Sequence, residues 1–294
     1  MRSELSMTRA TSPLSASLAP GLYLVATPIG AARDITLRGL DILGAADMLA
    51  AEDTRTARKL MELHGISRDG RQIVAYHDHN GPTARPRLLA ALQEGKSVAY
   101  VSEAGTPMVA DPGYQLVRDA HDANVPVFAA PGASAVLSAL CVAGLPTDRF
   151  YFAGFPPSSA KARETFLKGL KTIPGTLVLY ESPKRISELL KACLIVLGDR
   201  ECALCRELTK KFEETRRGMM SDVLTSVIDH PPKGEIVLVI GEGADEVASE
   251  GDIEAALREA LQTLKVKEAA AMIAEDFSIP RRDAYQMALK LGDK

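Results

Sequence analysis

Short apolar segments alternate with amphipathic segments along the first half of the chain. The apolar runs 21–26, 46–51, 72–76, 98–101 and 125–129 have the length of buried strands, and between them apolar residues recur every three or four positions. Strands that alternate with helices in this way are typical of a parallel sheet covered on both faces. The pattern therefore predicts an α/β fold for this half.

The second half of the chain also combines strand-like and helix-like segments, but with less regular spacing. Five strands are expected here, at Phe150–Phe155, Thr176–Tyr180, Glu201–Arg206, Thr215–Met219 and Glu235–Ile240. Three helices are expected beside them, near 161–170, 183–196 and 221–229. This order predicts a smaller, mixed sheet, joined to the first by the turn-rich segment Gly144–Asp148.

The two ends of the chain differ from both halves. The first twenty residues are rich in Ser and Thr and contain no apolar core, which favours a disordered extension over a secretory signal. A Gly-rich acidic stretch at 241–251 precedes two helical patterns with a short turn between them, as in a helix-turn-helix-like unit. The expected organisation is an extension at 1–20, α/β domains at 21–146 and 147–243, and a helical domain at 252–294.

Composition narrows the class of protein. Apolar residues make up 46% and charged residues 25% of the chain, with a net charge of −3, which argues against a uniformly basic nucleic-acid binder. No apolar stretch is long enough to span a membrane. Four cysteines do not make a disulfide framework, and Cys202 and Cys205 are expected to be buried thiols in a strand. A cytoplasmic location is expected.

The longest loop of the first half follows the strand Val98–Val101. It contains Gly105, Pro107, Pro112 and Gly113, a density of turn-forming residues that indicates a rigid loop. Ordinary connections of this kind need only about 2–6 residues, and open α/β sheets bind ligands at the carboxyl edge of their strands. We interpret this loop as a ligand-binding loop, with an ordinary strand-to-helix connection as the structural alternative.

Other strand ends carry polar residues that suggest chemistry. Glu52-Asp53-Thr54-Arg55 brings two carboxylates and a guanidinium together, either as a site or because Asp53 caps the next helix and Arg55 screens it. His77 and His79 lack further metal ligands, so a polar loop facing substrate, with Asn80, is favoured over a metal site. Two loops, 180–185 and 206–211, combine cations with acids and suggest a phosphate-bearing substrate.

Eight motifs occur in order between Thr27 and Glu214: TPIGxxxDITLRGL, AAEDTR, HDHN, VSEAGTPMVADPG, PGASA, GLPTDRF, YESPKR and ELTKKFEE. Together they resemble the family of ribosomal small-subunit RNA (cytidine-2′-O)-methyltransferases, called RsmI, within the tetrapyrrole-methylase-like (class III) methyltransferases. The resemblance implies two α/β domains with a cofactor cleft between them and a C-terminal helix-turn-helix-like domain. It also implies S-adenosyl-L-methionine as cofactor, 16S rRNA of the small ribosomal subunit as substrate, and a homodimer.

The resemblance also assigns residues to this cleft. The residues that it places at the cofactor are Pro28, Gly105, Thr106, Pro107, Val109, Ser134, Ala135, Tyr180 and Leu208. Attack by a ribose 2′-hydroxyl needs a proton acceptor, for which the candidates are Glu52, Asp53 and Glu181. Substrate contacts are expected from Arg55, His77, His79, Asn80, Arg185, Arg206 and Lys210. No metal is expected.

Two rival functions fit parts of the pattern. Another class III methylase, acting on a tetrapyrrole carbon or on a modified protein, would have no use for two basic loops and a helical tail. A non-catalytic RNA-binding assembly factor would share those features but would not bind the cofactor. Calorimetry with S-adenosylmethionine separates the second rival from both enzymes.

Overall fold

The computed structural model describes residues 17–77, 80–243, 250–277 and 279–292. The expectations for most of the 1–20 extension, for Asp78 and His79, and for Ser278 lie outside these residues. The contacts divide the chain into two compact units, residues 1–241 and 242–294. The larger unit contains two sheets of five strands each, so the second sheet is mixed as expected but not smaller in its number of strands.

The first sheet is entirely parallel, in the order β3-β2-β4-β1-β5. Its strands are β1 (Gly21–Val25), β2 (Met48–Ala51), β3 (Ile73–Ala75), β4 (Ser97–Val101) and β5 (Val127–Ala130). The helices that follow them are α1 (Leu37–Ala45), α2 (Thr54–Leu63), α3 (Gly81–Gln93), α4 (Tyr114–Asp122) and α5 (Ala135–Ala143), with a 3₁₀ turn at Ala32–Asp34.

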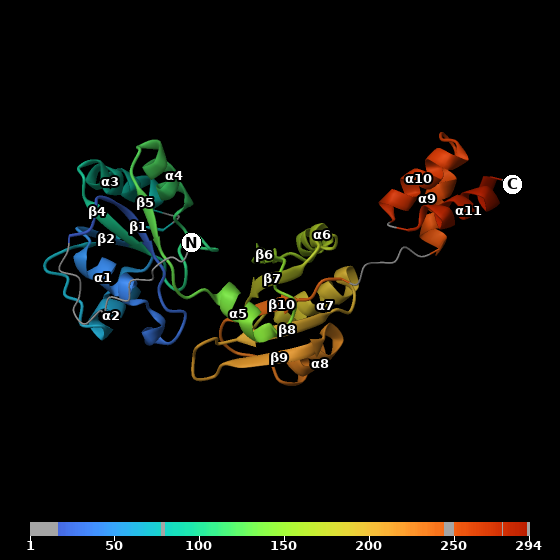
Figure 1. The fold of residues 1–294 in the computed structure, drawn as a ribbon. Helices are drawn as coiled ribbons and strands as arrows, with labels where there is room; N and C mark the ends of the chain where they lie inside the picture. The colour runs from blue at the N-terminus through green and yellow to red at the C-terminus, as the bar shows by residue number, and fades with distance from the viewer. Residues whose placement is uncertain (1–16, 78–79, 244–249, 278, 293–294) are drawn as a thin grey trace, which may run out of the picture. The chain divides into compact units, whose positions relative to one another are not determined.

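Alternation along the strands gives this sheet two buried faces. Tyr23 and Val25 of β1 pack with α1 and α2, whereas Leu22 packs on the opposite face with α3 and α4. Figure 1 shows the two pairs of helices on opposite sides of the sheet. The predicted parallel sheet with both faces covered is therefore confirmed, and it places the ends of β1, β2, β4 and β5 at one edge.

The second sheet has the order β6-β7-β10-β8-β9, in which only the β6 and β7 pair is parallel. Its strands are β6 (Phe150–Gly154), β7 (Thr176–Glu181), β8 (Glu201–Arg206), β9 (Glu214–Met219) and β10 (Ile236–Ile240). Its helices are α6 (Ala160–Leu170), α7 (Ile186–Leu197) and α8 (Met220–Asp229).

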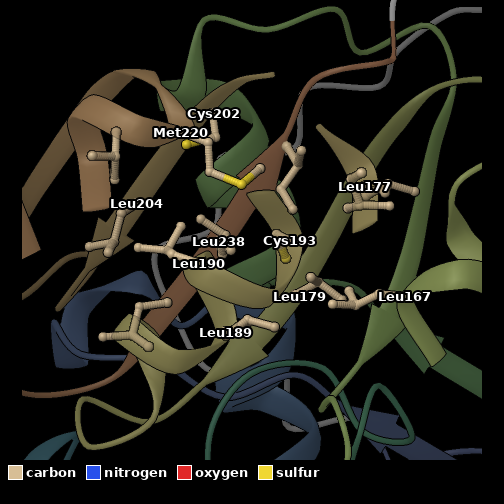
Figure 2. Close-up of a cluster of buried hydrophobic side chains, with 14 of the residues drawn as sticks. Leu167, Leu177, Leu179, Leu189, Leu190, Cys193, Cys202, Leu204, Met220 and Leu238 are labelled. Atoms are coloured by element: carbon tan, nitrogen blue, oxygen red, sulfur yellow. The ribbon is translucent and has the colours of Figure 1, made fainter. Parts of the chain in front are cut away.

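One face of this sheet forms a large apolar core with α6, α7 and α8. Leu177 and Leu179 of β7 point into it, beside Leu167 and Leu190 (Figure 2). Cys202 is also part of this core, as expected for a buried thiol, and Cys205 is buried on the other face.

The opposite face of the second sheet is covered by α5. Val136, Ala139 and Leu140 of this helix pack against Val178 of β7 and Val239 of β10. The helix lies before the expected boundary at 146/147, yet its apolar side faces the second sheet. A single helix that follows β5 and covers the next sheet joins the two parts of the larger unit. The 146/147 boundary stays a prediction.

The smaller unit contains three helices in its described part, α9 (Glu250–Ala260), α10 (Val266–Asp276) and α11 (Arg281–Gly292). Its core is built from small side chains such as Ala270, Ala284 and Ala288 around Leu257 and Ile273. Small side chains allow the helices to approach closely. The cluster contains residues of this unit alone, so the unit has a core of its own. In the described residues, no helix is both long and apolar enough to cross a lipid bilayer.

Candidate functional site

Three loops at the carboxyl edge of the first sheet are tied to one another. The backbone N–H of Thr27, after β1, donates to the carbonyl of Gly105 at 2.8 Å, and the Gly105 N–H donates back at 3.0 Å. The Thr106 hydroxyl donates to the carbonyl of Ala133, after β5, at 2.9 Å. These bonds bring together the loops that contain the expected cofactor residues Pro28, 105–107 and Ser134–Ala135.

The loop between β4 and α4 has an unusual backbone. Met108 and Ala110 have φ angles of 70° and 62°, a region that residues with a side chain rarely adopt. At Gly113, φ is 134°, and a Cβ atom there would lie 3.1 Å from the ring of the buried Tyr100. The Tyr100 hydroxyl donates to the Pro112 carbonyl at 3.0 Å. A backbone held in strained conformations by buried contacts is typical of a functional loop.

A loop of the second sheet faces the loop after β1. This connection between β8 and β9 contains Thr209, whose hydroxyl accepts the Ala31 N–H at 3.1 Å. Gly30 approaches it so closely that a Cβ atom would lie 2.6 Å from the Thr209 Oγ1 and 3.0 Å from the Leu208 carbonyl. Glu207 and Thr209 both have positive φ angles, of 51° and 64°. Only a glycine fits at this meeting of two loops.

Four of the nine expected cofactor residues, from both sheets, lie in one apolar cluster. Val109 and Ala135 lie in it with Tyr180 and Leu208, around the buried Ile29. All nine expected cofactor residues are buried or half-buried. The structure therefore brings together residues that lie as far apart in the chain as Ile29 and Leu208.

Tyr180 is the aromatic residue of this cluster. Its ring packs against Phe152 and Phe155, with centroid distances of 4.9 and 5.3 Å. Burial, with a smaller contribution from the Asp111 charge, raises the pKa of Tyr180 to about 12. The phenol therefore stays protonated at neutral pH and can act as a hydrogen-bond donor.

Asp53, one of the expected proton acceptors, has a structural role. Its carboxylate accepts the Arg55 N–H at 2.7 Å at the start of α2 and pairs with the Arg55 guanidinium at 2.7 Å. Hydrogen bonds from the Arg55 side chain and backbone lower the pKa of Asp53 to about 2. A carboxylate with so low a pKa is a weak proton acceptor, so the helix-cap alternative explains this residue better.

Glu181 is also held by its neighbours. Its side chain is only 1% exposed, accepts the Ser182 N–H at 2.7 Å and pairs with Arg185 at 3.0 Å. Arg185 donates in addition to the Pro156 carbonyl at 2.6 Å. The pair joins the start of α7 to the chain after β6. The Glu181 carboxylate is thus enclosed, while the Arg185 side chain is 31% exposed but shared between Glu181 and the Pro156 carbonyl.

Glu52 lies at the edge of the site, where its carboxylate accepts the Glu103 N–H at 3.0 Å. The charge of Glu52 acts on Asp111, a carboxylate that sequence reasoning did not select. Burial first, and then the Glu52 charge, raise the pKa of Asp111 to about 6. The sequence placed Asp111 in the long loop but gave no sign that the loop would half-bury it.

Several expected substrate residues are engaged within the protein. Arg206 pairs with Glu214 at 2.5 Å, and Lys210 pairs with Glu207 and Glu235 at 3.1 and 2.8 Å. These cations are therefore neutralised by acids from their own sheet. Arg55, paired with Asp53, has a side chain that is 85% exposed and is the most accessible of the expected cations.

The end of β3 has a polar turn and a cavity beside it. Asn80 accepts the His77 N–H at 2.8 Å and donates to the Ala75 carbonyl at 2.9 Å, which shapes the turn. A cavity of about 190 Å³ is lined by Tyr76, His77, Gly81, Arg85, Asp111, Pro112, Gly113, Tyr114 and Gln115. His79 lies outside the described residues. Among those residues, His, Cys, Asp and Glu side chains form no group of three that could hold a metal ion.

The fold is similar to those of several solved enzymes. Diphthine synthase matches with a TM-score of 0.57 at 16% identity, over 75% of this chain and 89% of its own. Cobalt precorrin-4 methyltransferase matches with a TM-score of 0.55 at 19% identity, over 75% and 94%. Uroporphyrin-III C-methyltransferase from Thermus thermophilus, complexed with S-adenyl homocysteine, gives 0.51 at 23% identity, over 76% and 97%. These likenesses show the fold.

Curated proteins found by sequence are more similar to this chain than these solved structures are. Ribosomal RNA small subunit methyltransferase I of Mesorhizobium japonicum is 45% identical over 282 residues, which cover 94% of each chain. Its namesake in Escherichia coli O157:H7 is 41% identical, over 92% of this chain and 94% of its own. The profile of the Tetrapyrrole (Corrin/Porphyrin) Methylases matches residues 21–224, and that of the RsmI C-terminal HTH domain matches residues 247–292. The chain belongs to the ribosomal RNA small subunit methyltransferase I family of tetrapyrrole-methylase-like methyltransferases.

Proposed function

We propose that this protein transfers a methyl group from S-adenosyl-L-methionine to the ribose 2′-hydroxyl of a cytidine in 16S rRNA of the small ribosomal subunit. The observation that carries the proposal is the meeting of four loops, three from the first sheet and one from the second, around one apolar cluster. Family membership supplies the reaction class.

The residues present fit this cofactor. The Thr27 Oγ1 atom is buried and has no hydrogen-bond partner among the described residues, so it is available to a polar ligand. Backbone groups of Gly105–Pro107 and of Ser134 would hold the polar parts of the cofactor. Val109, Ala135, Tyr180 and Leu208 would contact its apolar surface. When bound, the cofactor supplies an activated methyl group, and the protein positions the acceptor and excludes water.

The RNA substrate calls for cationic surfaces that the loops themselves do not supply. The four expected Arg and Lys side chains are all paired with acids, and Arg55, although paired with Asp53, is the most exposed of them and so the best candidate for a phosphate contact. We propose that the helical unit at 252–294 adds a second contact to the RNA, through Lys265, Lys267, Arg281, Arg282 and Lys290.

We also propose that the protein acts in the cytoplasm as a homodimer. Strand β6 is an edge strand of the second sheet and exposes the aromatic residues Phe150 and Tyr151, at 45% and 46%. Phe155, after the strand, is 61% exposed. Unprotected edges with apolar side chains favour pairing with a second copy. Analytical ultracentrifugation of the full chain tests this, and a monomer at micromolar concentration would refute it.

The test of the reaction is incubation with labelled cofactor and small subunits from a strain that lacks the enzyme. The expected result is one labelled ribose methyl on 16S rRNA, located by nuclease mapping. Label on ribosomal protein, label on a base, or no label on RNA would refute the proposed function.

A further inference from the structure

We propose that Phe212, at the tip of the β8–β9 loop, is a stacking platform for an unpaired base of the RNA next to the target nucleotide. This inference rests on the proposed methyl transfer to RNA and adds to it one specific contact with the substrate. Phe212 lies in the motif ELTKKFEE, from which the sequence selected only Leu208 and Lys210 as site residues.

The tip of this loop is a tight turn with a defined shape. The Glu213 N–H donates to the Lys210 carbonyl at 3.1 Å, which places Lys211 and Phe212 at the two central positions of a β-turn. The Glu213 carboxylate accepts the Thr209 N–H at 2.6 Å and so closes the turn a second time. Both central residues are exposed.

The residues before the tip are anchored to the rest of the larger unit. Leu208 lies in the apolar cluster, and the Thr209 hydroxyl accepts the Ala31 N–H at 3.1 Å. The Lys210 ammonium pairs with Glu235, in the segment before β10, at 2.8 Å. A loop held in this way presents its tip in one place, so a ligand that binds the tip does not have to order it.

The fold does not explain why Phe212 is exposed. The residue is 63% exposed, although Phe belongs to the residue types that are most often buried. Within the part of the chain that the structure describes, its ring packs into none of the buried apolar clusters. The turn does not require it either, because turns favour Gly, Asn, Asp, Ser and Pro. Strand β6, where we propose the homodimer contact, is the opposite edge strand of this sheet.

The surroundings of the ring suit a nucleic-acid base. The Lys211 ammonium lies 5.5 Å from the Phe212 ring centroid, a cation–π contact that favours one orientation of the exposed ring. Single-stranded RNA is recognised largely by stacking on such aromatic side chains, and every base has a π face that can stack. Because Lys210 is already paired with acids, this tip contributes stacking more than charge.

The tip also lies near the proposed cofactor site. Leu208 of the apolar cluster and Phe212 are four residues apart, so their Cα atoms are separated by at most about 14 Å, and the turn shortens this distance. When the target nucleotide enters the cleft, the neighbouring base loses a stacking partner. The Phe212 ring is placed to replace that partner.

The decisive comparison is between Phe212→Leu and Phe212→Trp in the full chain. Leucine keeps an apolar side chain but has no π surface, whereas tryptophan has a larger one. Methylation of small subunits from a strain that lacks the enzyme is measured at saturating cofactor. We expect Phe212→Leu to raise KM for the subunits by about 5- to 100-fold, the usual effect of losing one stacked base. Phe212→Trp should keep KM or lower it.

Three further readouts separate stacking from a structural role. Phe212→Leu should leave kcat, the Tm and the affinity for S-adenosylhomocysteine unchanged, because the side chain is exposed and outside the apolar cluster. Ile195→Ala is the matched control and should keep the wild-type KM. Ile195 is 84% exposed, and its helix α7 covers the face of the second sheet opposite to α5.

These measurements can also overturn the proposal. It fails if Phe212→Leu keeps the wild-type KM, if Phe212→Trp loses as much as Phe212→Leu, or if Phe212→Leu lowers the Tm or the cofactor affinity. Failure of the wild type to methylate RNA would instead refute the proposed function.

Photocrosslinking tests the class of partner that contacts the ring. The photoreactive analogue p-benzoylphenylalanine is introduced in place of Phe212, and the full chain is irradiated on small subunits. We expect crosslinks to 16S rRNA close to the methylated nucleotide. Crosslinks only to a ribosomal protein, or only to a second copy of this chain, would overturn the proposal.

Discussion

Asp53 and Asp111 both follow strands of the first sheet, and their surroundings drive their proton affinities apart. Asp53 has a pKa of about 2 because Arg55 donates hydrogen bonds to it. Asp111 has a pKa of about 6 because it is half-buried beside Glu52. One sheet edge therefore holds one carboxyl that is fully ionised at neutral pH and another that begins to bind protons only a little below it.

The raised pKa of Asp111 predicts a cost in stability. An unfolded Asp titrates near about 3.9, so ionising Asp111 in the folded state is unfavourable. Its stabilising contribution is full below about pH 4 and is lost as the pH rises through about 6. Asp111→Asn should therefore raise the Tm at pH 7.5, by about 2–4 °C for each kcal/mol gained, and have little effect below pH 4. Calorimetric scans check this, and a lower Tm at pH 7.5 would contradict it.

Asp53 predicts the opposite behaviour. Asp53→Ala removes the cap of α2 and should lower the free energy of unfolding by about 0.5–2 kcal/mol while leaving turnover near that of the wild type. The depressed pKa means that this stabilisation is present above about pH 4 and lost as the pH falls towards 2. Urea titration of Asp53→Ala against Glu62→Ala, an exposed acid of the same helix, measures it. A large loss of turnover in Asp53→Ala would restore Asp53 as a base.

These two residues also show what a sequence can and cannot reveal about a site. The motif around Asp53 is compatible with a cap and with a base, and only the geometry of Arg55 decides between them. Asp111 lies in the loop that the sequence marks as important, but its charge acts on Tyr180, which is 69 residues further along the chain. The pKa of a side chain depends on long-range packing, which the local sequence pattern does not reveal.

At the scale of elements, the loop after β1 and the β8–β9 loop meet at Gly30, so we expect cofactor binding to depend on this glycine. Gly30→Ala would place a methyl group 2.6 Å from the Thr209 hydroxyl and 3.0 Å from the Leu208 carbonyl, so the loop must move. We expect cofactor affinity to fall about tenfold or more, as for a contact worth about 1.4 kcal/mol. Gly44→Ala, with nothing within 4 Å of the added atom, is the control and should keep full affinity. Equal affinities measured by calorimetry would contradict this.

Most elements were predictable because each has its own local pattern. Strand β8 has the predicted bounds, and α6 begins one residue before the expected range 161–170, because apolar periodicity defines both elements. The partner of α5 was not predictable. Its sequence is apolar around most of its circumference, so nothing local indicates that Val136 and Ala139 face the second sheet rather than the first.

At the scale of the molecule, the division at Gly241 predicts that the cofactor site is independent of the helical unit. All nine expected cofactor residues lie in the larger unit, and the smaller unit has its own core. A chain that ends at residue 241 should bind S-adenosylhomocysteine as tightly as the full chain but methylate small subunits more slowly. Calorimetry and methylation assays on both chains check this. A truncated chain that binds no cofactor would show that the helical unit completes the site.

The paired cations of the β8–β9 region have a consequence for how the protein finds its RNA. Arg206 and Lys210 already have carboxylate partners, and the whole chain has a net charge of −3. Few condensed ions would leave the RNA where it meets this surface, so Arg206 and Lys210 should add little to the fall of the logarithm of affinity with the logarithm of salt concentration. The salt dependence of RNA binding should come instead from the exposed Arg55 and the cations of the helical unit. Filter binding across a salt series, on free 16S rRNA and on intact subunits, measures this salt dependence.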